Sequence, residues 1–399
     1  MINAKVFFND GDEEYITALR RELHMHPELE TELPATCGIV KRELEAMGIP
    51  YSEEYAQSGI VGYINYDCGN GAGNDGHVYT IGLRADMDAL PVTEETGLPY
   101  ASLNPGKMHA CGHDAHTAML LGAARALKRA EADGAIKYRV KLFFQPNEEG
   151  KTEGAALFVK NGALKDVDII FGQHVSNDIP AGKLAYREGP AQAACYAYTI
   201  VFKGLAVHAT VPQEGHDALC MAVKAVNDIY LMNSREIDPF KPHIISVGSL
   251  HAGTAHNIIA DRAEIQLTFR FYDDDVKDIV DRRIREICEN AARELSGSVS
   301  VDLQISADPL INDAYAVSKA VEAQKLIVGE ENVVVSGLRM GSEDFSFYLK
   351  ECPGCFSRIG TGNPLKGCTG SAHSSAFMID EDVLLTGAQY LAQLALLDY

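Results

Sequence analysis

A predicted strand followed at once by two adjacent carboxylates is the feature that most constrains this chain. Residues 139–144 are apolar and rich in β-favouring side chains, which predicts a buried strand. Glu148 and Glu149 follow directly, so both leave the sheet at the carboxyl end of that strand. Ligand and catalytic groups of open α/β sheets gather at this end. An isolated Glu-Glu pair is more often a solvated turn, so a functional interpretation needs support from other motifs.

Two further predicted strands end in side chains that suit a metal site. Residues 77–83 form a predicted strand that runs into Asp86 and Asp88, and two acids at i and i+2 can face one site. Residues 167–171 predict another strand, which ends in a segment that contains His174. All three strand ends are expected at the same edge of a parallel sheet.

Cys111 and His113 precede an Ala- and Leu-rich helix predicted for residues 117–130. A position at a helix amino terminus lowers the pKa of a thiol. Thiolate, imidazole and carboxylate are the usual ligands of zinc and related ions. Taken alone, Cys111 would more often be a buried structural cysteine, but four such motifs within about ninety residues are typical of a metallohydrolase.

Other elements follow from periodicity and composition. Apolar residues at helical spacing predict helices at residues 12–30 and 34–48. A strand is predicted at residues 59–66, and the polar, glycine-rich residues 67–76 predict a loop. A closing helix is predicted at residues 382–397.

From about residue 187 the pattern changes to a β-α-β-β-α-β unit, which is an α+β (ferredoxin-like) arrangement. Glycine-rich segments at residues 340–345 and 370–377 then resume the earlier composition, so this unit interrupts the first domain. We therefore predict an α/β catalytic domain at residues 1–186 and 307–399, with an inserted domain at 187–306. The predicted elements of the insert are strands at 195–202, 243–251, 263–272 and 299–305 and helices at 216–232 and 275–295.

Composition excludes several classes of partner. The 399 residues are enough for two or three domains, and the net charge of -21 argues against nucleic acid and anionic membrane surfaces as partners. The amino terminus lacks the pattern of a signal peptide and no long uncharged apolar run follows, so we expect a cytoplasmic protein. Nine scattered cysteines, an odd number, favour a reducing compartment over a disulfide framework.

These motifs resemble those of the bacterial and plant N-acyl-amino-acid amidohydrolases. That family includes hippurate hydrolases and auxin-conjugate hydrolases and is related to two-metal aminoacylases and carboxypeptidases. The resemblance implies a mixed sheet flanked by helices in a catalytic domain that holds two divalent ions, and an inserted lid domain that mediates homodimer formation. It extends nearly from end to end and rests on residues 21–29, 84–91, 108–116, 145–150, 172–175, 253–257 and 341–345.

The resemblance also implies a role for individual residues. Glu148 corresponds to the general base, which takes a proton from the attacking water and hands it to the leaving amine. Two metal ions would polarise the amide carbonyl and lower the pKa of that water. The implied metal ligands are Cys111, His113, Glu149, His174 and His373.

In the lid, His208 matches the family's histidine that reaches into the partner subunit's site and steadies the oxyanion. Asn257 and Arg270 match positions that bind the free carboxylate of the substrate, a role that suits a bidentate guanidinium. His208 by itself would more often be a structural histidine.

The chain departs from the family pattern at several positions, while every ligand type is present. We expect these departures to affect acyl specificity and lid geometry more than the chemistry. Ala206 and Val207 stand where the family usually has two glycines, Ser375 where it has proline, and Leu267 with Thr268 where it has Gly-Thr.

The sequence therefore predicts metal-dependent hydrolysis of N-acyl amino acids, with zinc, manganese, cobalt or nickel as candidate ions. A dipeptidase or aminopeptidase-like enzyme of the same superfamily is the first alternative. A non-catalytic binding protein with the same fold is the second, and the intact Glu148 speaks against it. A thiol enzyme that uses Cys111 as nucleophile is the third, and it would be insensitive to chelators.

Overall fold

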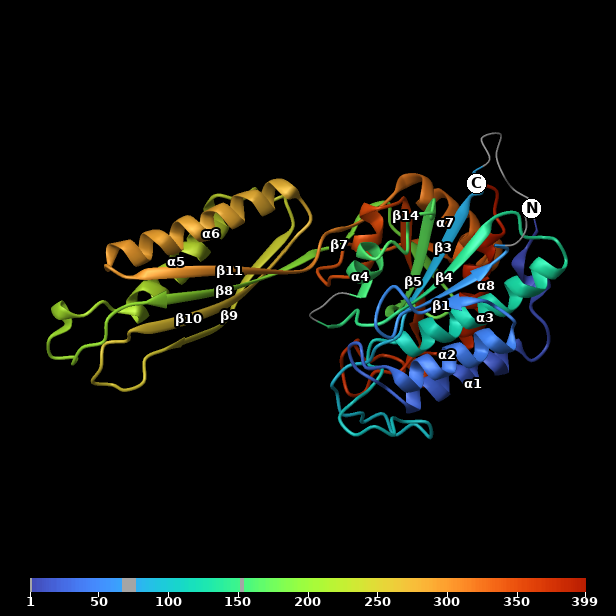
Figure 1. Cartoon of the computed structure of the whole chain (residues 1–399), viewed down its shortest axis with the longest axis horizontal. Helices are drawn as coiled ribbons and strands as arrows, with labels where there is room; N and C mark the ends of the chain where they lie inside the picture. Colours follow the sequence, from blue (N-terminus) through green and yellow to red (C-terminus); the bar gives the residue numbers. More distant parts are fainter. Residues whose placement is uncertain (1, 67–76, 151–153) are drawn as a thin grey trace. The chain divides into compact units, whose positions relative to one another are not determined.

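The chain divides into two compact units in the computed structural model, which describes residues 2–66, 77–150 and 154–399 (Figure 1). Unit 1 contains Met1–Ala191, Ile311–Gly337 and Asp344–Tyr399. Unit 2 contains Gln192–Leu310 and Leu338–Glu343, so it is inserted in the sequence of unit 1. The predicted loop at residues 67–76 lies outside the described residues.

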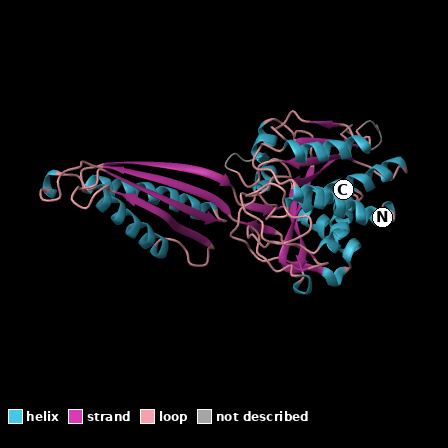
Figure 2. Ribbon diagram, turned by 90° about the horizontal axis from the view of Figure 1, so that it is seen from below, coloured by secondary structure: helices cyan, strands magenta, loops and turns pink. Residues whose placement is uncertain are grey.

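Unit 1 is built on an eight-stranded mixed sheet with the order β1-β2-β4-β3-β5-β14-β6-β13. Figure 2 shows strands of unit 1 in magenta among cyan helices. The central strands β4, β3, β5 and β14 run parallel, whereas β2 and β6 are antiparallel to β4 and β14. This confirms the predicted mixed sheet. The strands are β1 Tyr51–Ser52, β2 Ile60–Ile64, β3 Thr80–Asp86, β4 Arg139–Gln145, β5 Ile169–Pro180, β6 Leu184–Tyr186, β13 Val333–Val335 and β14 Gly354–Gly362.

Both faces of this sheet are covered, because successive side chains of a strand point to opposite faces. Leu142 and Phe144 of β4 join the large core that contains the helices, whereas Phe143 contacts Phe158 and Tyr348 on the other face. The parallel strands are therefore buried on both sides, as their continuous apolar composition requires. The helices are α1 Asp12–Met25, α2 Pro34–Ala46, α3 His113–Ala132, α4 Gly154–Lys160, α7 Ala314–Val328 and α8 Leu384–Ala395.

Three predicted boundaries were wrong in ways that matter for the site. Helix α1 ends at Met25 rather than at residue 30, because Pro27 disfavours helical conformation in the residue before it. Helix α3 begins at His113 rather than at residue 117. Strand β5 continues to Pro180, so His174 lies within the strand and not in a loop after it.

Gly112 allows α3 to begin where it does. Its φ is +92°, in the left-handed region that favours glycine, and an added Cβ would lie 2.4 Å from Cγ2 of Val175. The chain can therefore turn sharply between Cys111 and His113 only because this residue has no side chain.

Unit 2 is a four-stranded antiparallel sheet, with the order β11-β8-β10-β9, and two helices. Strand β8 alternates between buried and half-buried residues, as expected when one face packs on helices. This confirms the predicted β-α-β-β-α-β insert. Its elements are β8 Ala194–Lys203, α5 Ala218–Arg235, β9 His243–Ala252, β10 Arg262–Phe271, α6 Asp274–Glu294 and β11 Ser298–Ala307. A separate two-stranded sheet is formed by β7 Gly189–Gln192 and β12 Leu310–Asn312. None of the described helices has both the length and the apolar composition needed to cross a membrane.

Candidate metal centre

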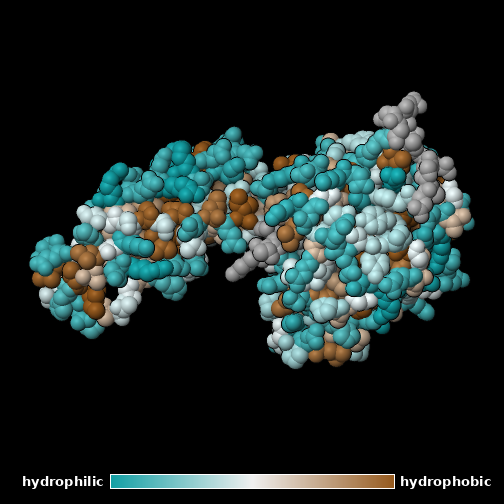
Figure 3. All heavy atoms as spheres, viewed as in Figure 1, coloured by the Kyte–Doolittle hydropathy of each residue, from teal (hydrophilic) through white to brown (hydrophobic). Residues whose placement is uncertain are grey.

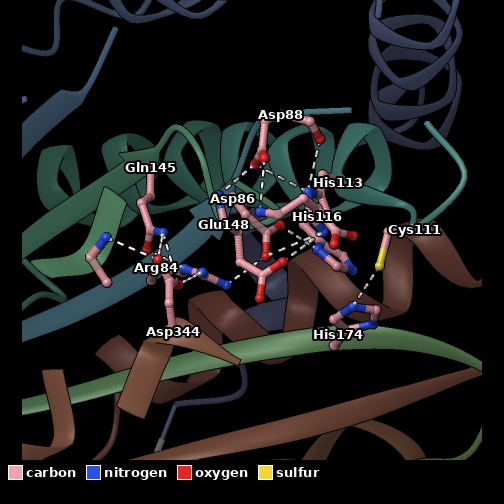
Figure 4. Close-up of polar contacts among 12 residues, drawn as sticks. Arg84, Asp86, Asp88, Cys111, His113, His116, Gln145, Glu148, His174 and Asp344 are labelled. Atoms are coloured by element: carbon pink, nitrogen blue, oxygen red, sulfur yellow. Dashed lines mark hydrogen bonds and ion pairs between the residues drawn. The ribbon is translucent and has the colours of Figure 1, made fainter. Parts of the chain in front are cut away.

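The parallel strands of unit 1 bring the predicted motifs together at one edge of the sheet (Figure 4). Asp86 at the end of β3 pairs with Gln145 at the end of β4. Arg84 pairs with Gly172 of β5, so Asp86 and His174 each lie two residues further along adjacent strands. Side chains at these strand ends therefore face the amino terminus of α3, which carries Cys111 and His113.

Cys111, His113 and His174 form a largely buried group of metal-ligating atoms. Their ligand atoms lie within 4.8 Å of one another, and Sγ of Cys111 is 3.4 Å from Nε2 of His174. A second group with the same spacing contains Cys111, Glu149 and His373, in which Nε2 of His373 is 3.0 Å from Glu149. Cys111 belongs to both groups, so the five predicted ligands form one continuous cluster around its sulfur.

Backbone carbonyls fix the orientation of both buried imidazoles. Nδ1 of His113 donates to the carbonyl of Asp88 at 2.8 Å, and Nδ1 of His174 donates to the carbonyl of Val175 at 2.6 Å. A carbonyl only accepts, so Nδ1 carries the proton in each ring and Nε2 faces the cluster. Nε2 of His113 is buried without a hydrogen-bond partner among the described residues. This arrangement is usual for histidine ligands of metal ions.

The protonation state of the cluster is linked to the binding of a metal ion. The hydrogen bond with Cys111, and next that with Glu149, raises the pKa of His373 to about 10. Burial lowers the pKa of His113, but Asp86 and Cys111 outweigh it and hold that pKa well above its usual value. Burial holds the pKa of His174 well below its usual value, so this ring is neutral. His113 and His373 are therefore protonated, and a metal ion would compete with these protons for the ring nitrogen atoms.

The pKa of Cys111 differs from the expectation based on its position. Cys111 directly precedes the amino terminus of α3, but burial, and next the nearby Glu149, raise its pKa. The desolvation of a buried thiolate outweighs the helix dipole. The prediction that the helix terminus alone lowers this pKa was therefore wrong, and a bound cation is what would deprotonate the thiol.

His116 lies beside the cluster but is not a candidate ligand, although the sequence offers no sign of this. Its Nδ1 is 2.6 Å from a carboxylate oxygen of Asp86, and its Nε2 accepts the backbone N–H of Val175 at 2.9 Å. A backbone N–H only donates, so Nε2 has no proton and its lone pair is occupied. His116 thereby fixes the segment of β5 that carries His174.

Arg84 balances two buried carboxylates next to the cluster. Its guanidinium contacts Asp86 at 2.5 Å and Asp344 at 2.8 Å, and its Nε donates to Gln145 at 2.8 Å. Burial raises the pKa of Asp86, but Arg84 outweighs it and keeps that pKa well below its usual value. The anionic charge available to a metal ion is therefore that of the adjacent glutamates, together with that of Cys111 once a bound ion has deprotonated its thiol. Nothing in the sequence indicated the roles of Arg84 and Asp344.

The two glutamates of the turn after β4 have different surroundings. Glu149 lies against His373 and Cys111, whereas Glu148 lies on the side of His113, 3.9 Å from its Nε2. Burial raises the pKa of Glu149, but the hydrogen bond from His373 and the charge of His113 outweigh it and lower that pKa. Glu149 is therefore ionised and placed as a ligand, while the Glu148 carboxylate borders the same space.

Two segments of the cluster, the turn before Glu149 and the loop of His373, contain a residue with a left-handed backbone conformation. His373 has a φ of +68° and Asn147, next to Glu148, has a φ of +61°. Such values are uncommon outside glycine and concentrate at functional sites. The His373 side chain is 54% exposed, and its backbone N–H donates to the carbonyl of Ala110 at 2.8 Å. The loop of His373 is thus tied to the segment that carries Cys111.

The three predicted residues of the insert lie in unit 2. His208 is exposed and its Nδ1 is 2.8 Å from Oγ1 of Thr210. Asn257 is next to it, because the N–H of Ala209 donates to the carbonyl of Asn257. Arg270 lies on β10, and its guanidinium donates to Oγ of Ser342 at 3.1 Å. Their part in a site of unit 1 stays a prediction.

Comparison with known proteins identifies the family. The profile of peptidase family M20/M25/M40 matches residues 82–397. The chain belongs to this family. The match confirms the family predicted from the sequence and makes the chain a metal-dependent M20 hydrolase of amide or peptide bonds.

Several M20 relatives are similar over nearly the whole chain. Thermostable carboxypeptidase 2 of Saccharolobus solfataricus is 37% identical, over 96% of this chain and 95% of that protein. IAA-amino acid hydrolase ILR1-like 4 of Arabidopsis thaliana is 36% identical, over 96% and 85%. N-acetyl-L-cysteine deacetylase of Bacillus subtilis is 34% identical, over 96% and 88%.

Among solved structures, the Bacillus subtilis YXEP protein is similar to this chain with a TM-score of 0.81 and 30% identity, over 97% of this chain and 98% of that one. It is described as a dinuclear metal binding peptidase from the M20 family. The cluster around Cys111 offers sulfur, nitrogen and oxygen donors to such a pair of ions.

Proposed function

We propose that this M20 hydrolase cleaves the amide bond of N-acyl amino acids and releases a carboxylic acid and an amino acid. The observation that carries the proposal is the placement of Glu148 beside the Cys111 cluster, with its carboxylate 3.9 Å from Nε2 of His113. From this position the carboxylate can exchange a proton with a group that reacts at the cluster. Two of the relatives described above act, by name, on conjugates or acyl derivatives of amino acids, which supports this substrate class.

The proposed ligands are Cys111, His113, Glu149, His174 and His373. Bound divalent ions would supply a polarised carbonyl and a more acidic water. Glu148 would accept a proton from the attacking water and deliver it to the leaving nitrogen. His113 and His174 would hold their ring orientation through this step, because their Nδ1 protons are committed to backbone carbonyls.

A panel of substrates tests the proposal. The purified protein is stripped with a chelator, reloaded with zinc, manganese, cobalt or nickel, and assayed with N-acetyl amino acids and with dipeptides that carry the same carboxyl-terminal residues. We expect higher kcat/KM for the N-acetyl compounds. A consistent preference for a free α-amino group would favour the dipeptidase alternative, and cleavage of long peptides would favour a carboxypeptidase, as one relative is named. Activity that survives the chelator would point to a thiol enzyme.

We further propose a homodimer formed through unit 2, where apolar residues reach the surface (Figure 3). Leu219, Val223 and Tyr230 of α5 are each more than 40% exposed and share one side of the helix. Strand β9, which packs near α5, is an edge strand of its sheet, so one side of it has no neighbouring strand among the described residues. An apolar stripe beside an open strand edge is the usual composition of a surface that pairs with a second copy.

In such a dimer, His208 would serve the active site of the partner. Mixing inactive His208→Ala chains with inactive Glu148→Gln chains is then expected to restore activity, because one composite site regains both groups. If subunit exchange is verified and no activity returns, His208 acts within its own chain or not at all.

A further inference from the structure

Two hydrogen bonds tie the loop of His373 to the Glu95 segment, residues 92–98. The N–H of Glu95 donates to the carbonyl of Ser375 at 2.8 Å, and the hydroxyl of Ser375 donates to a carboxylate oxygen of Glu95 at 2.5 Å. Each residue is thus both donor and acceptor for the other, and this contact is called the Glu95–Ser375 pair. Both residues belong to unit 1, and Ser375 lies two residues beyond His373.

Two successive turns carry His373 and Ser375. The N–H of Ser374 donates to the carbonyl of Ser371 at 3.2 Å, so His373 occupies the third position of a four-residue turn, with φ at +68°. The N–H of Phe377 donates to the carbonyl of Ser374 at 3.2 Å, so Ser375 occupies the second position of the next turn. Proline is favoured at that position because its ring fixes φ, and serine has no such constraint. Ser375 is one of the departures from the family pattern, so here another contact has to hold the second turn.

The Glu95 segment is itself fixed to the core of unit 1 through Glu94. The Glu94 side chain is only 4% exposed, and one of its oxygens lies 3.2 Å from Nε2 of His24. The other oxygen accepts the N–H of Ser102 at 2.7 Å. Nδ1 of His24 lies 2.7 Å from the carboxylate of Asp114, the residue that follows His113 in α3. The Glu95 segment is thus attached to the helix that carries a buried proposed ligand, so it offers the His373 loop a fixed support.

We propose that Glu95 and Ser375 are positioning residues, which hold the His373 imidazole against Glu149 and thereby set the affinity of the metal centre. The N–H of His373 donates to the carbonyl of Ala110 at 2.8 Å, and one such bond leaves the loop free to rotate about it. The Glu95–Ser375 pair supplies a further point of attachment two residues along. This inference rests on the proposed function, since it takes His373 as a ligand. Neither Glu95 nor Ser375 is among the proposed ligands.

Tyr51 provides a matched control elsewhere in unit 1. Its hydroxyl donates to the carboxylate of Glu45 at 2.8 Å, and this contact is also exposed. Tyr51 lies on β1, the outermost strand of the sheet, so Tyr51→Phe removes a surface contact of the same chemistry away from the His373 loop. Ser375→Thr is a second control, because it keeps the hydroxyl that Ser375→Ala removes.

The test measures the Kd for zinc by chelator competition in the full-length protein. Without the pair, binding of the ion would also have to order the loop, so we expect the Kd to rise about 3- to 10-fold in Ser375→Ala and in Glu95→Ala. The double variant should show no further rise, because both substitutions remove one contact. Tyr51→Phe and Ser375→Thr should keep the wild-type Kd. In the metal-depleted protein, hydrogen exchange of residues 371–377 should be faster in Ser375→Ala, while the Tm stays the same.

His373→Ala separates a failure of this inference from a failure of the proposed function. An unchanged Kd in Ser375→Ala, together with weaker zinc binding in His373→Ala, would overturn the inference and leave the proposed function standing. Additive effects in the double variant, or an equal rise in Tyr51→Phe, would also overturn it. If His373→Ala keeps the wild-type affinity, the ligand assignment of the proposed function fails as well. Should Ser375→Ala not fold, Glu95→Ala removes the same side-chain contact from its other partner and decides the question.

Discussion

The two sides of the proposed metal centre are built differently. Cys111, His113 and His174 are buried in the core of unit 1, and hydrogen bonds to backbone carbonyls fix both imidazoles. Glu149 lies on a turn, two residues after the left-handed Asn147, and His373 lies on an exposed loop and is itself left-handed. The inner side is thus placed by core packing, while the outer side is placed by local backbone conformation and a few hydrogen bonds. Substitutions on the inner side should cost stability as well as metal, and those on the outer side mainly function.

The largest effect is expected on the outer side, at Glu148. Glu148→Gln keeps size and hydrogen bonding but removes the proton acceptor, so kcat should fall about 10²- to 10⁴-fold while metal content stays nearly intact. Steady-state kinetics and elemental analysis measure the two quantities. Its neighbour is the control, because Glu149→Gln should lose metal first and activity as a consequence. If the two variants behave in the reverse way, the roles of base and ligand are exchanged.

Cys111→Ser and His373→Ala compare the two sides directly. Cys111 belongs to both donor groups, and a hydroxyl stays protonated and ligates poorly, so metal affinity and activity should fall together by about 100-fold or more. His373→Ala should weaken metal binding less and leave the Tm of the metal-depleted protein unchanged, because its side chain is half exposed. Full metal stoichiometry in Cys111→Ser would contradict the ligand assignment.

A smaller effect is expected when a support of the inner side is removed. His116→Phe keeps a ring in place but leaves the N–H of Val175 and one carboxylate oxygen of Asp86 without the His116 partner, so the Kd for metal should rise about 10- to 100-fold. His109→Phe is the control, since His109 is buried and neither ring nitrogen has a hydrogen-bond partner among the described residues. Equal effects in both variants would mean that ring packing, and not the His116 hydrogen bonds, supports His174.

The most gradual effect is the dependence of metal binding on pH, because it develops over several pH units and removes no side chain. The pKa of His373 is raised to about 10, and those of His113 and Cys111 are also raised, so all three groups carry protons at neutral pH. A metal ion must displace these protons, so affinity should rise with pH up to these pKa values and fall as pH is lowered, by about tenfold per pH unit for each proton released. Calorimetry in two buffers of different ionisation enthalpy counts the protons. No proton release at pH 7 would contradict the raised pKa values.

Local sequence pattern determined the elements and the general place of the site. Strand β4 begins at the predicted residue 139 and ends one residue beyond the predicted end, and the insert has the predicted order of strands and helices. Such patterns are readable because hydrophobic period, Gly and Pro act within a few residues. The same reasoning placed Glu148, Glu149 and His174 at one edge of the sheet, since carboxyl ends of parallel strands meet there. The family followed from those motifs and their order.

Only the tertiary structure decided which donors are available to a metal ion. His116 and His113 look alike in the sequence, yet Asp86 and Val175 occupy both nitrogens of one, while Nε2 of the other faces the cluster. Arg84 donates a hydrogen bond to Asp344, which is 260 residues away in the sequence, and Asp88 accepts one from the backbone of Glu148, which is 60 residues away. Hydrogen bonds between residues so distant in the sequence cannot be predicted from its periodicity. The packing of the strand ends in the folded protein decides which residues become partners. Burial likewise reversed the expected pKa shift of Cys111, since desolvation depends on the whole core and not on the neighbouring helix terminus.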